Sequence, residues 1–333
     1  MKERVFMPCL ATHYYFGKDV FERLGKETKS HLEQAIPYFE SFNQGPDFFF
    51  AYHLLNLKKG QQVRDFGRYM QTHKTKDFFF HTIQYILDHD LQTDPQVIAF
   101  LYGFICHYTL DLTVHPFVFY KTGAFHPKEK DTHKYNGKHM EMETCIDAYL
   151  IFQREKMFPK EFKIHNCVLE HPQFNDTLLQ LIDSVCHDVY QQEKMGSLYE
   201  ASLHQTYTFY RLMRYDPTGI KKAFYSFVDF MTPSSVTKVR YLSYNIKEKR
   251  KRFFMNLEKE QWNHPFDPNE AYHFSFIELY RIAITRAVDT IEAVEQVLYR
   301  QKKIDTLNDV FQNLSYTTGK DCDIHKRMRY FEY

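Results

Sequence analysis

Residues 100–120 read FLYGFICHYTLDLTVHPFVFY, a run that is apolar almost throughout yet carries His107, Asp111 and His115 at four-residue intervals. On an α-helix, positions four apart differ by only about 40° around the axis, so the three polar side chains lie on one stripe. The other faces, with Phe104 and Leu110 among their side chains, are apolar. The stretch therefore predicts a long helix in the protein core, with three polar groups directed at one place.

Three explanations compete for this polar stripe. A membrane span has the right length, but an Asp and two His in mid-span would be costly in lipid, and the sequence has no second segment of this kind. A hydrogen-bonded core network is the usual explanation for a single buried His. Three groups in register favour a bound divalent cation instead, because a metal ion satisfies imidazole and carboxylate together.

Composition and periodicity predict an all-α fold. The 333 residues include only 11 Gly and 12 Pro, and no alternating pattern is long enough to support a sheet. Asp94 before Pro95 marks a helix start, and Asp267, Pro268 and Glu270 form a capping-box pattern before a long amphipathic helix. Other helices are expected at about 18–40, 75–90, 94–120, 138–155, 173–192 and 196–213. We expect one all-helical domain over residues 1–333, with the metal-ligand motifs in 1–155 and a helical part, 156–333, that carries little obvious chemistry.

Charge and cysteine usage narrow the class of protein. The net charge is +1, which gives no reason to expect a stable nucleic-acid complex, and no obligate protein partner is evident. The local run KEKRKR, residues 247–252, is expected to be a solvated helix face, with peripheral membrane contact as the less favoured alternative. Six Cys without CxxC pairing and a start, MKERVFMPCL, without an apolar signal region indicate a cytoplasmic protein.

Further candidate ligands flank the central stretch. Downstream, GKHMEMETCIDAYL places His139 and Glu143 four residues apart on a probable helix. Upstream, Asp47 lies in a Gly-Pro-Asp turn before an aromatic run, and His13 lies near the N-terminus. Nitrogen and carboxylate ligands without Cys are typical of catalytic zinc sites rather than structural ones.

In this order, His13, the GPD at Asp47, HYTLDLTVHP and HMEME resemble the zinc-dependent phospholipase C family, relatives of the S1/P1 nucleases. These motifs cover about the first 150 residues. A later stretch, NLEKEQWNHPFDPNEAYHFSFIELYRIA, is similar to the C-terminal part of uncharacterised bacterial members that lack a signal peptide. The resemblance implies an all-helical bundle with a zinc cluster in its core cleft.

The resemblance also implies a role for each motif residue. His107 and Asp111 fit the central HxxxD, with Asp111 bridging two metals, and His115, His139 and Glu143 supply the second metal. Asp47 would bind or activate the nucleophilic water, and His13 would belong to a third metal. A Glu at position 143 is typical of the phospholipase branch rather than the nucleases.

Three departures from the family pattern affect this assignment. Secreted relatives complete the third metal with an N-terminal Trp amino group, which the Met1 start does not supply, so two zinc ions are expected and a third is not relied on. The histidine after the central Asp comes four residues on, at His115, rather than six, which leaves His126 as a substitute. Gln71 stands where similar proteins have a His, so His73 is the candidate replacement.

The function implied is a zinc-dependent phosphodiesterase of phospholipase C type, in which metal-bound hydroxide attacks a phosphate ester. Phe48 and Tyr52, after the GPD, would contact the substrate, for instance a choline head group. Plain core packing is the alternative for these rings. An S1/P1-like nuclease or nucleotidase is the second candidate function, and a catalytically degenerate ligand- or lipid-binding protein of the same fold is the third.

Overall fold

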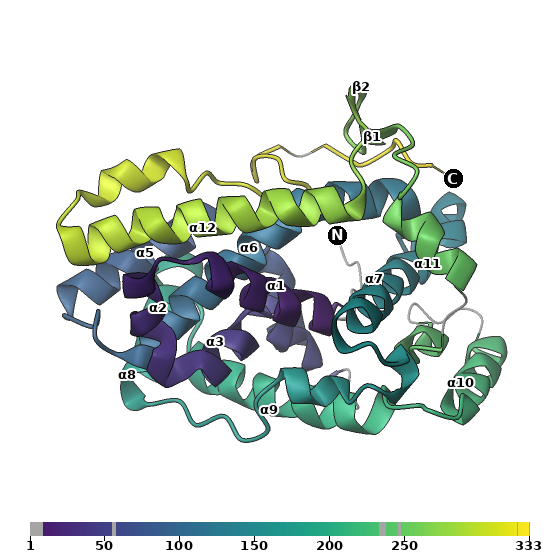
Figure 1. The fold of residues 1–333 in the computed structure, drawn as a ribbon, viewed down its shortest axis with the longest axis horizontal. Helices are drawn as coiled ribbons and strands as arrows, with labels where there is room; N and C mark the ends of the chain where they lie inside the picture. The colour runs from purple at the N-terminus through teal and green to yellow at the C-terminus, as the bar shows by residue number, and fades with distance from the viewer. Residues whose placement is uncertain (1–8, 55–57, 233–237, 246–247, 325, 333) are drawn as a thin grey trace.

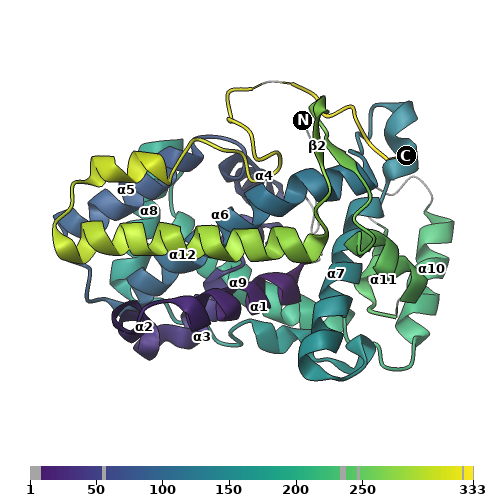
Figure 2. The same ribbon diagram turned by 45° about the horizontal axis from the view of Figure 1, so that its top comes forward.

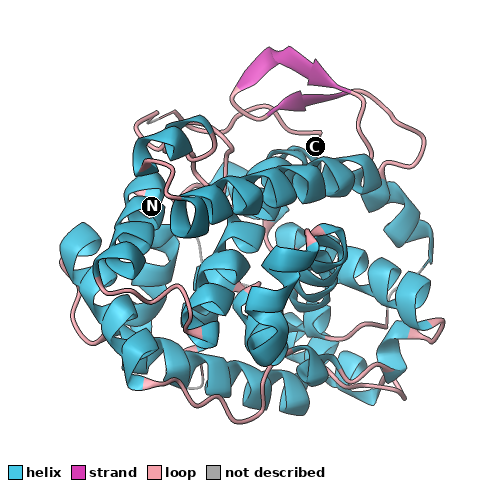
Figure 3. Cartoon of the chain, turned by 60° about the vertical axis from the view of Figure 1, so that its left-hand side comes forward, coloured by secondary structure: helices cyan, strands magenta, loops and turns pink. Residues whose placement is uncertain are grey.

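The computed structural model describes residues 9–54, 58–232, 238–245, 248–324 and 326–332, and within 248–251 only the backbone. Helices form nearly all of the regular structure, as the sequence predicts, and a two-stranded hairpin lies at the edge of the helical body (Figure 3). The main elements are α1 (Leu10–Arg23), α2 (Lys26–Leu32), α3 (Ile36–Phe42), η2 (Gly45–Ala51), α4 (Gln61–Met70), α5 (Thr75–Asp88), α6 (Pro95–Thr122), α7 (Lys138–Glu155), η5 (Ile164–Cys167), α8 (Asp176–Tyr190), α9 (Met195–Met213), α10 (Ile220–Met231), η6 (Val239–Leu242), α11 (Glu248–Met255), β1 (Trp262–His264), β2 (Asp267–Tyr272) and α12 (Phe276–Arg300).

Helix α6 is the central element of the fold. Asp94 caps its first turn by accepting hydrogen bonds from the backbone N–H groups of Gln96 and Val97, as the Asp-Pro pair predicts. The helix is long and apolar enough to cross a membrane, but 94% of its most apolar window is buried inside the protein. The long helix α12 runs beside it along the length of the molecule (Figures 1 and 2), and α1, α3 and α7 also pack on it. Its apolar side chains therefore form the core.

Pro116 lies inside α6, which continues to Thr122, close to the predicted end of this helix at residue 120. A proline inside a helix removes one hydrogen bond and frees the carbonyl four residues earlier, here that of Leu112. The C-terminal segment packs directly on that carbonyl at Gly319, where a Cβ atom would come within 2.5 Å of the Leu112 oxygen. Tertiary packing therefore covers the carbonyl that Pro116 leaves without its helical partner.

The expected capping box at Asp267 is also wrong. Residues 267–272 form β2, which pairs antiparallel with β1, and Oδ1 of Asp267 accepts a hydrogen bond from the backbone N–H of Asn269 within β2. Helix α12 begins after Ser275 instead, where Ser275 and Glu278 form the capping box. The aromatic contact between Trp262 and Tyr272, with ring centroids 4.6 Å apart, stabilises this short hairpin. The strands are too short for the alternating sequence pattern to predict them.

Two further expectations need adjustment. The single helix predicted over 18–40 is divided into α1, α2 and α3, with Leu24 and Gly25 extended between the first two. The cationic run 247–252 falls mostly on α11, as expected of a helix. Residue 247 and the side chains of 248–251 lie outside the described part of the chain, whereas Arg252 is exposed.

Candidate metal centre

The candidate ligands come from four elements that meet at the middle of α6. His13 lies in the first turns of α1, Asp47 lies in η2, and α7 supplies two of the remaining side chains. Helix α6 contributes three ligands on one stripe, at positions 107, 111 and 115. Gly45 in the GPD turn has a φ of +48° and lies against the His107 ring, where a Cβ atom would come within 2.5 Å of Cγ. The glycine therefore lets η2 bring Asp47 close to α6.

The inner group consists of His13, His107 and Asp111. Nε2 of His13 lies 3.3 Å from Oδ1 of Asp111, and Nε2 of His107 lies 3.1 Å from Oδ2 of the same carboxylate. The two imidazole rings stack with centroids 4.3 Å apart. All three side chains are at most 5% exposed. Asp47 borders this group, with Oδ1 3.9 Å from Nε2 of His107.

The outer group consists of His115, His139 and Glu143. Oε1 of Glu143 lies 2.9 Å from Nε2 of His139 and 3.7 Å from Nε2 of His115. The two imidazoles are 17% and 18% exposed, so this group reaches solvent. Nδ1 of His115 also lies 3.7 Å from Oδ2 of Asp111, which places that carboxylate between the two groups.

Backbone carbonyls fix the orientation of two of the imidazoles. Nδ1 of His107 is 3.2 Å from the carbonyl of Asn43, and Nδ1 of His115 is 2.9 Å from the carbonyl of Tyr316. With Nδ1–H donating to a carbonyl, the Nε2 lone pair of each ring is directed at the carboxylates. This arrangement is typical of metal-binding histidines, whose second nitrogen is held by the protein.

The donor atoms of the two groups fit a metal. Within each group, the ligand atoms all lie within 4.8 Å of one another. Four of their buried polar atoms have no hydrogen-bond partner among the described residues: His13 Nδ1, His107 Nε2, His139 Nδ1 and Glu143 Oε2. Leaving such atoms unsatisfied is costly, and imidazole nitrogen with carboxylate oxygen is a donor set that zinc prefers. Both groups could therefore hold a metal ion.

Electrostatics in the inner group favour a cation. Burial opposes ionisation of Asp111, but His107, His115 and His13 outweigh it and hold its pKa well below the ordinary value. Burial and the neighbouring His107 lower the pKa of His13. Burial, reinforced by the carboxylates Asp111 and Glu143, raises the pKa of Asp47 to about 7. Carboxylates are thus crowded into a poorly solvated space, where positive charge is stabilising.

The outer group shows the same balance. Burial opposes ionisation of Glu143, but His139 and His115 lower its pKa. Burial also disfavours protonation of His115, yet Asp111 and Glu143 raise its pKa to about 9. In the absence of a metal, a proton on His115 compensates the carboxylates, and a divalent ion would displace it.

Two of the candidate ligands, His73 and His126, lie apart from these groups. His73 stacks on Tyr69 with ring centroids 4.1 Å apart, and its Nδ1 is 2.8 Å from the Thr72 hydroxyl. Gln71, rather than His73, contacts the site, because its Nε2 donates a hydrogen bond to Oδ1 of Asp47 at 2.5 Å. The alternative ligand His126 lies in the loop after α6, where its backbone N–H donates to Thr132.

The aromatic residues predicted to contact substrate are placed differently from each other. Phe48 is fully buried and packs edge-on against Tyr199, so the core-packing alternative describes it and its ring is closed to substrate. Tyr52 is half-buried, and its ring lies edge-on to His53. The aromatic run after the GPD does not tell substrate contact from core packing, because an aromatic side chain suits both roles.

Sequence reasoning missed the residues that hold the site in place. Asp147 on α7 accepts hydrogen bonds from the backbone N–H and hydroxyl of Thr12, next to His13, at 2.8 and 2.7 Å, and from the hydroxyl of Tyr244 at 2.8 Å. It therefore ties α7 to the start of α1. Its spacing one turn beyond Glu143 was the available signal. The backbone carbonyl of Tyr316, which holds the His115 ring, could not be recognised in the sequence. Residues 156–333, which were expected to carry little obvious chemistry, therefore contribute to the site.

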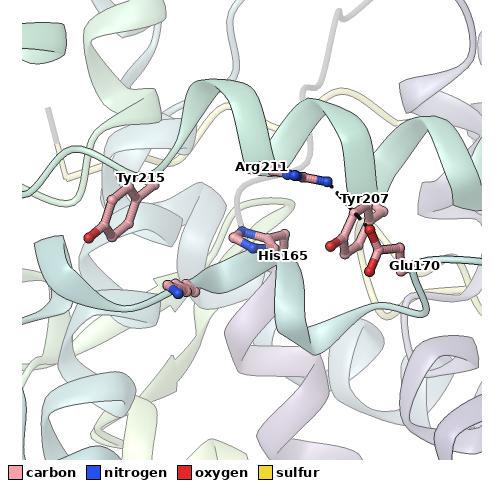
Figure 4. A pocket seen from close by; sticks show the side chains of 6 residues that line it. His165, Glu170, Tyr207, Arg211 and Tyr215 are labelled. Atoms are coloured by element: carbon pink, nitrogen blue, oxygen red, sulfur yellow. Dashed lines mark hydrogen bonds and ion pairs between the residues drawn. The ribbon is translucent and has the colours of Figure 1, made fainter.

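A separate pocket of about 380 Å³ lies away from these ligands. It is lined by Lys163, His165, Glu170, Tyr207, Arg211 and Tyr215, from α9 and the segment around η5 (Figure 4). Arg211 is already paired there with Glu170, at 3.4 Å. None of its lining residues belongs to the inner or outer group.

Comparisons with known proteins agree with this geometry. The family model described as zinc dependent phospholipase C matches residues 12–195, which include every member of both groups. The match ends before the stretch at 256–283 that resembles the C-terminal part of bacterial members. Neither the search of curated proteins nor the search of solved structures returned a match. Because the family model covers more than half of the chain and its helical fold agrees, the protein belongs to the zinc-dependent phospholipase C family.

Proposed function

We propose that the protein is a zinc-dependent phosphoric ester hydrolase of phospholipase C type, which cleaves a phospholipid or a small phosphodiester. The observation that carries the proposal is the position of Asp111: both of its oxygens contact histidines of the inner group, and Oδ2 also lies 3.7 Å from Nδ1 of His115 in the outer group. A bridging carboxylate is a common way to hold two metal ions close together. The two groups then act as one centre.

Zinc at this centre would polarise a phosphoryl oxygen and lower the pKa of a water molecule. The protein's own residues supply the rest. Asp47 faces the inner group from η2 and is held there by Gln71, so its carboxylate can orient a water molecule or accept its proton. The partly exposed imidazoles of His115 and His139 place the outer group at the side from which a substrate can approach.

Metal content and hydrolysis measured together test this proposal. The wild type should retain zinc after purification and hydrolyse at least one member of a panel consisting of a phosphocholine ester, a bis-aryl phosphodiester and single-stranded DNA. Asp111→Asn should lose zinc and reduce the rate at least about a hundredfold, because ligand loss should exceed the ten- to hundredfold effects of residues around a ligand. Asp289→Asn, at an exposed position on α12, is the matched control and should change neither.

The outcomes separate the candidate functions. Hydrolysis of DNA with no cleavage of the phosphocholine ester would favour the nuclease alternative. Stable zinc binding without activity on any substrate would favour a degenerate binding protein. Less than one zinc per chain together with activity that Asp111→Asn leaves unchanged would refute the metal-dependent hydrolase.

A further inference from the structure

Helix α10 presents its apolar side chains to solvent. Ile220, Phe224, Phe227, Phe230 and Met231, here called the α10 face, are between 59% and 79% exposed. At about 100° per residue, four of the five fall within an arc of about 60°, with Phe230 beside them. The three phenylalanines alone expose on the order of 400 Å² of apolar surface, as much as the largest patch on many monomeric proteins.

The polar side of α10 faces the protein, which fixes the apolar side outward. The hydroxyl of buried Tyr225 donates a hydrogen bond to the carbonyl of Met213 at 2.9 Å. Buried Asp229 accepts hydrogen bonds from the backbone N–H groups of Val239 and Arg240 at 2.9 and 3.1 Å. Turning the α10 face inward would break these bonds. The exposed surface is therefore built into the local structure.

The charge of the surrounding segment indicates what covers this face. Between residues 220 and 252 the sequence has nine Lys or Arg and two Asp or Glu, although the whole chain has a net charge of only +1. A second copy docked by two-fold symmetry would bring two such cationic segments together, which is unfavourable. An anionic lipid surface would instead attract the cations and accept the aromatic side chains, as for other interfacial amphipathic helices.

We propose that the α10 face inserts into the surface of a membrane containing anionic phospholipids and anchors the protein there. Figures 1 and 2 place α10 at one end of the molecule, in the region of α7 and α11. Segment η6 connects the two functions, because Asp229 binds its backbone and the carbonyl of Tyr241 accepts a hydrogen bond from Thr144, next to Glu143, at 2.9 Å. Segment η6 therefore connects α10, the proposed membrane anchor, to α7, the helix that carries His139 and Glu143. This inference goes beyond hydrolysis and is tested by binding alone.

Vesicle co-sedimentation in EDTA tests the proposal without any hydrolysis. The full chain should bind phosphatidylcholine vesicles that contain phosphatidylserine, bind pure phosphatidylcholine vesicles less, and dissociate as salt is raised. The combined variant Phe224→Ser/Phe227→Ser/Phe230→Ser should lower the affinity at least about tenfold, because the rings supply the inserted area. Phe158→Ser, at a ring that is 63% exposed and is not part of α10, is the matched control and should bind like the wild type.

The vesicle assay needs a folding control and has results that would overturn the proposed anchor. An unchanged circular dichroism spectrum and thermal unfolding midpoint would show that the triple variant remains folded. Wild-type protein that stays in the supernatant, or a folded triple variant that binds as tightly as the wild type, would overturn the proposal. So would a dimer, measured by analytical ultracentrifugation, that the triple variant abolishes while vesicles are not bound. If the protein hydrolyses none of the phosphate esters, these binding results keep their meaning.

Discussion

The inner and outer groups use the same ligand chemistry in different surroundings. His13, His107 and Asp111 are at most 5% exposed, and the His107 ring is enclosed by η2 and stacked on His13. His115 and His139 are 17% and 18% exposed and meet their carboxylate at the edge of the core. The inner group is therefore part of the folded core, whereas the outer group lies at the edge of the core and is accessible to solvent. A metal ion in the inner group would add to folding stability, and one in the outer group would meet substrate.

The largest expected contrast is in the metal-free protein. His107→Ala should lower the free energy of unfolding by about 3 kcal/mol, because it leaves a cavity in the core. His139→Ala should lower it by about 1 kcal/mol, since the ring is partly solvated and its neighbours can relax. Urea unfolding in EDTA measures both, with exposed His81→Ala as the control. Equal losses for the two variants would show that the two groups do not differ in the way described.

A smaller effect is expected from completing the inner group. Gln71→His would place an imidazole next to Asp47, where Gln71 now donates its hydrogen bond. We expect the affinity for zinc to rise about tenfold, because the new imidazole would either bind the metal itself or orient the Asp47 carboxylate more firmly. Competition with a chromophoric chelator measures the change, and Thr72→His, one residue farther on, is the control. An unchanged or weaker affinity would mean that Gln71 does not stand in a ligand position.

A pH-dependent effect concerns the link between the two groups. Burial raises the pKa of Asp147 to about 6, against the opposing influence of Arg214 and its hydrogen-bond donors. Because this pKa is above the ordinary value, the stabilisation from Asp147 is fully present below about pH 4 and is lost as the pH rises through about 6. Asp147→Asn keeps an acceptor for Thr12 but does not ionise. From pH 4 to pH 7, wild type should therefore lose about 2–3 kcal/mol of unfolding free energy relative to the variant.

Urea unfolding of both proteins across this pH range, in EDTA, measures the difference, in which other titrating carboxylates cancel. A constant difference from pH 4 to pH 7 would show that Asp147 titrates at its ordinary pKa. A rising stability of wild type relative to the variant would show that its partners favour the ionised form.

The sequence predicted the parts of the site that depend on helical periodicity. Four-residue spacing places His107, Asp111 and His115 on one stripe, and it places His139 and Glu143 on another, whatever the rest of the chain does. It could not predict how α6 accommodates Pro116, because the packing of Gly319 on the Leu112 carbonyl joins positions about 200 residues apart in the chain. The choice between Gln71 and His73 depends on where α4 ends, and boundaries are the least certain part of any sequence-based assignment.

The contribution of the C-terminal half was unpredictable for the same reason. Tyr316 supports His115 through its backbone carbonyl, which every residue possesses, so its side chain gives no signal. The α10 face shows the opposite case, because its apolar spacing is visible in the sequence but predicts a buried stripe. Only the hydrogen bonds of Tyr225 and Asp229 determine which side of α10 turns inward.

Anomalous diffraction from crystals of the zinc-loaded protein, recorded on both sides of the zinc absorption edge, would show directly whether the two groups bind zinc. We expect one zinc peak within the inner group and one within the outer group, with the Asp111 carboxylate between them. Peaks at other side chains, or no zinc at either group in protein that has been incubated with the metal, would contradict it.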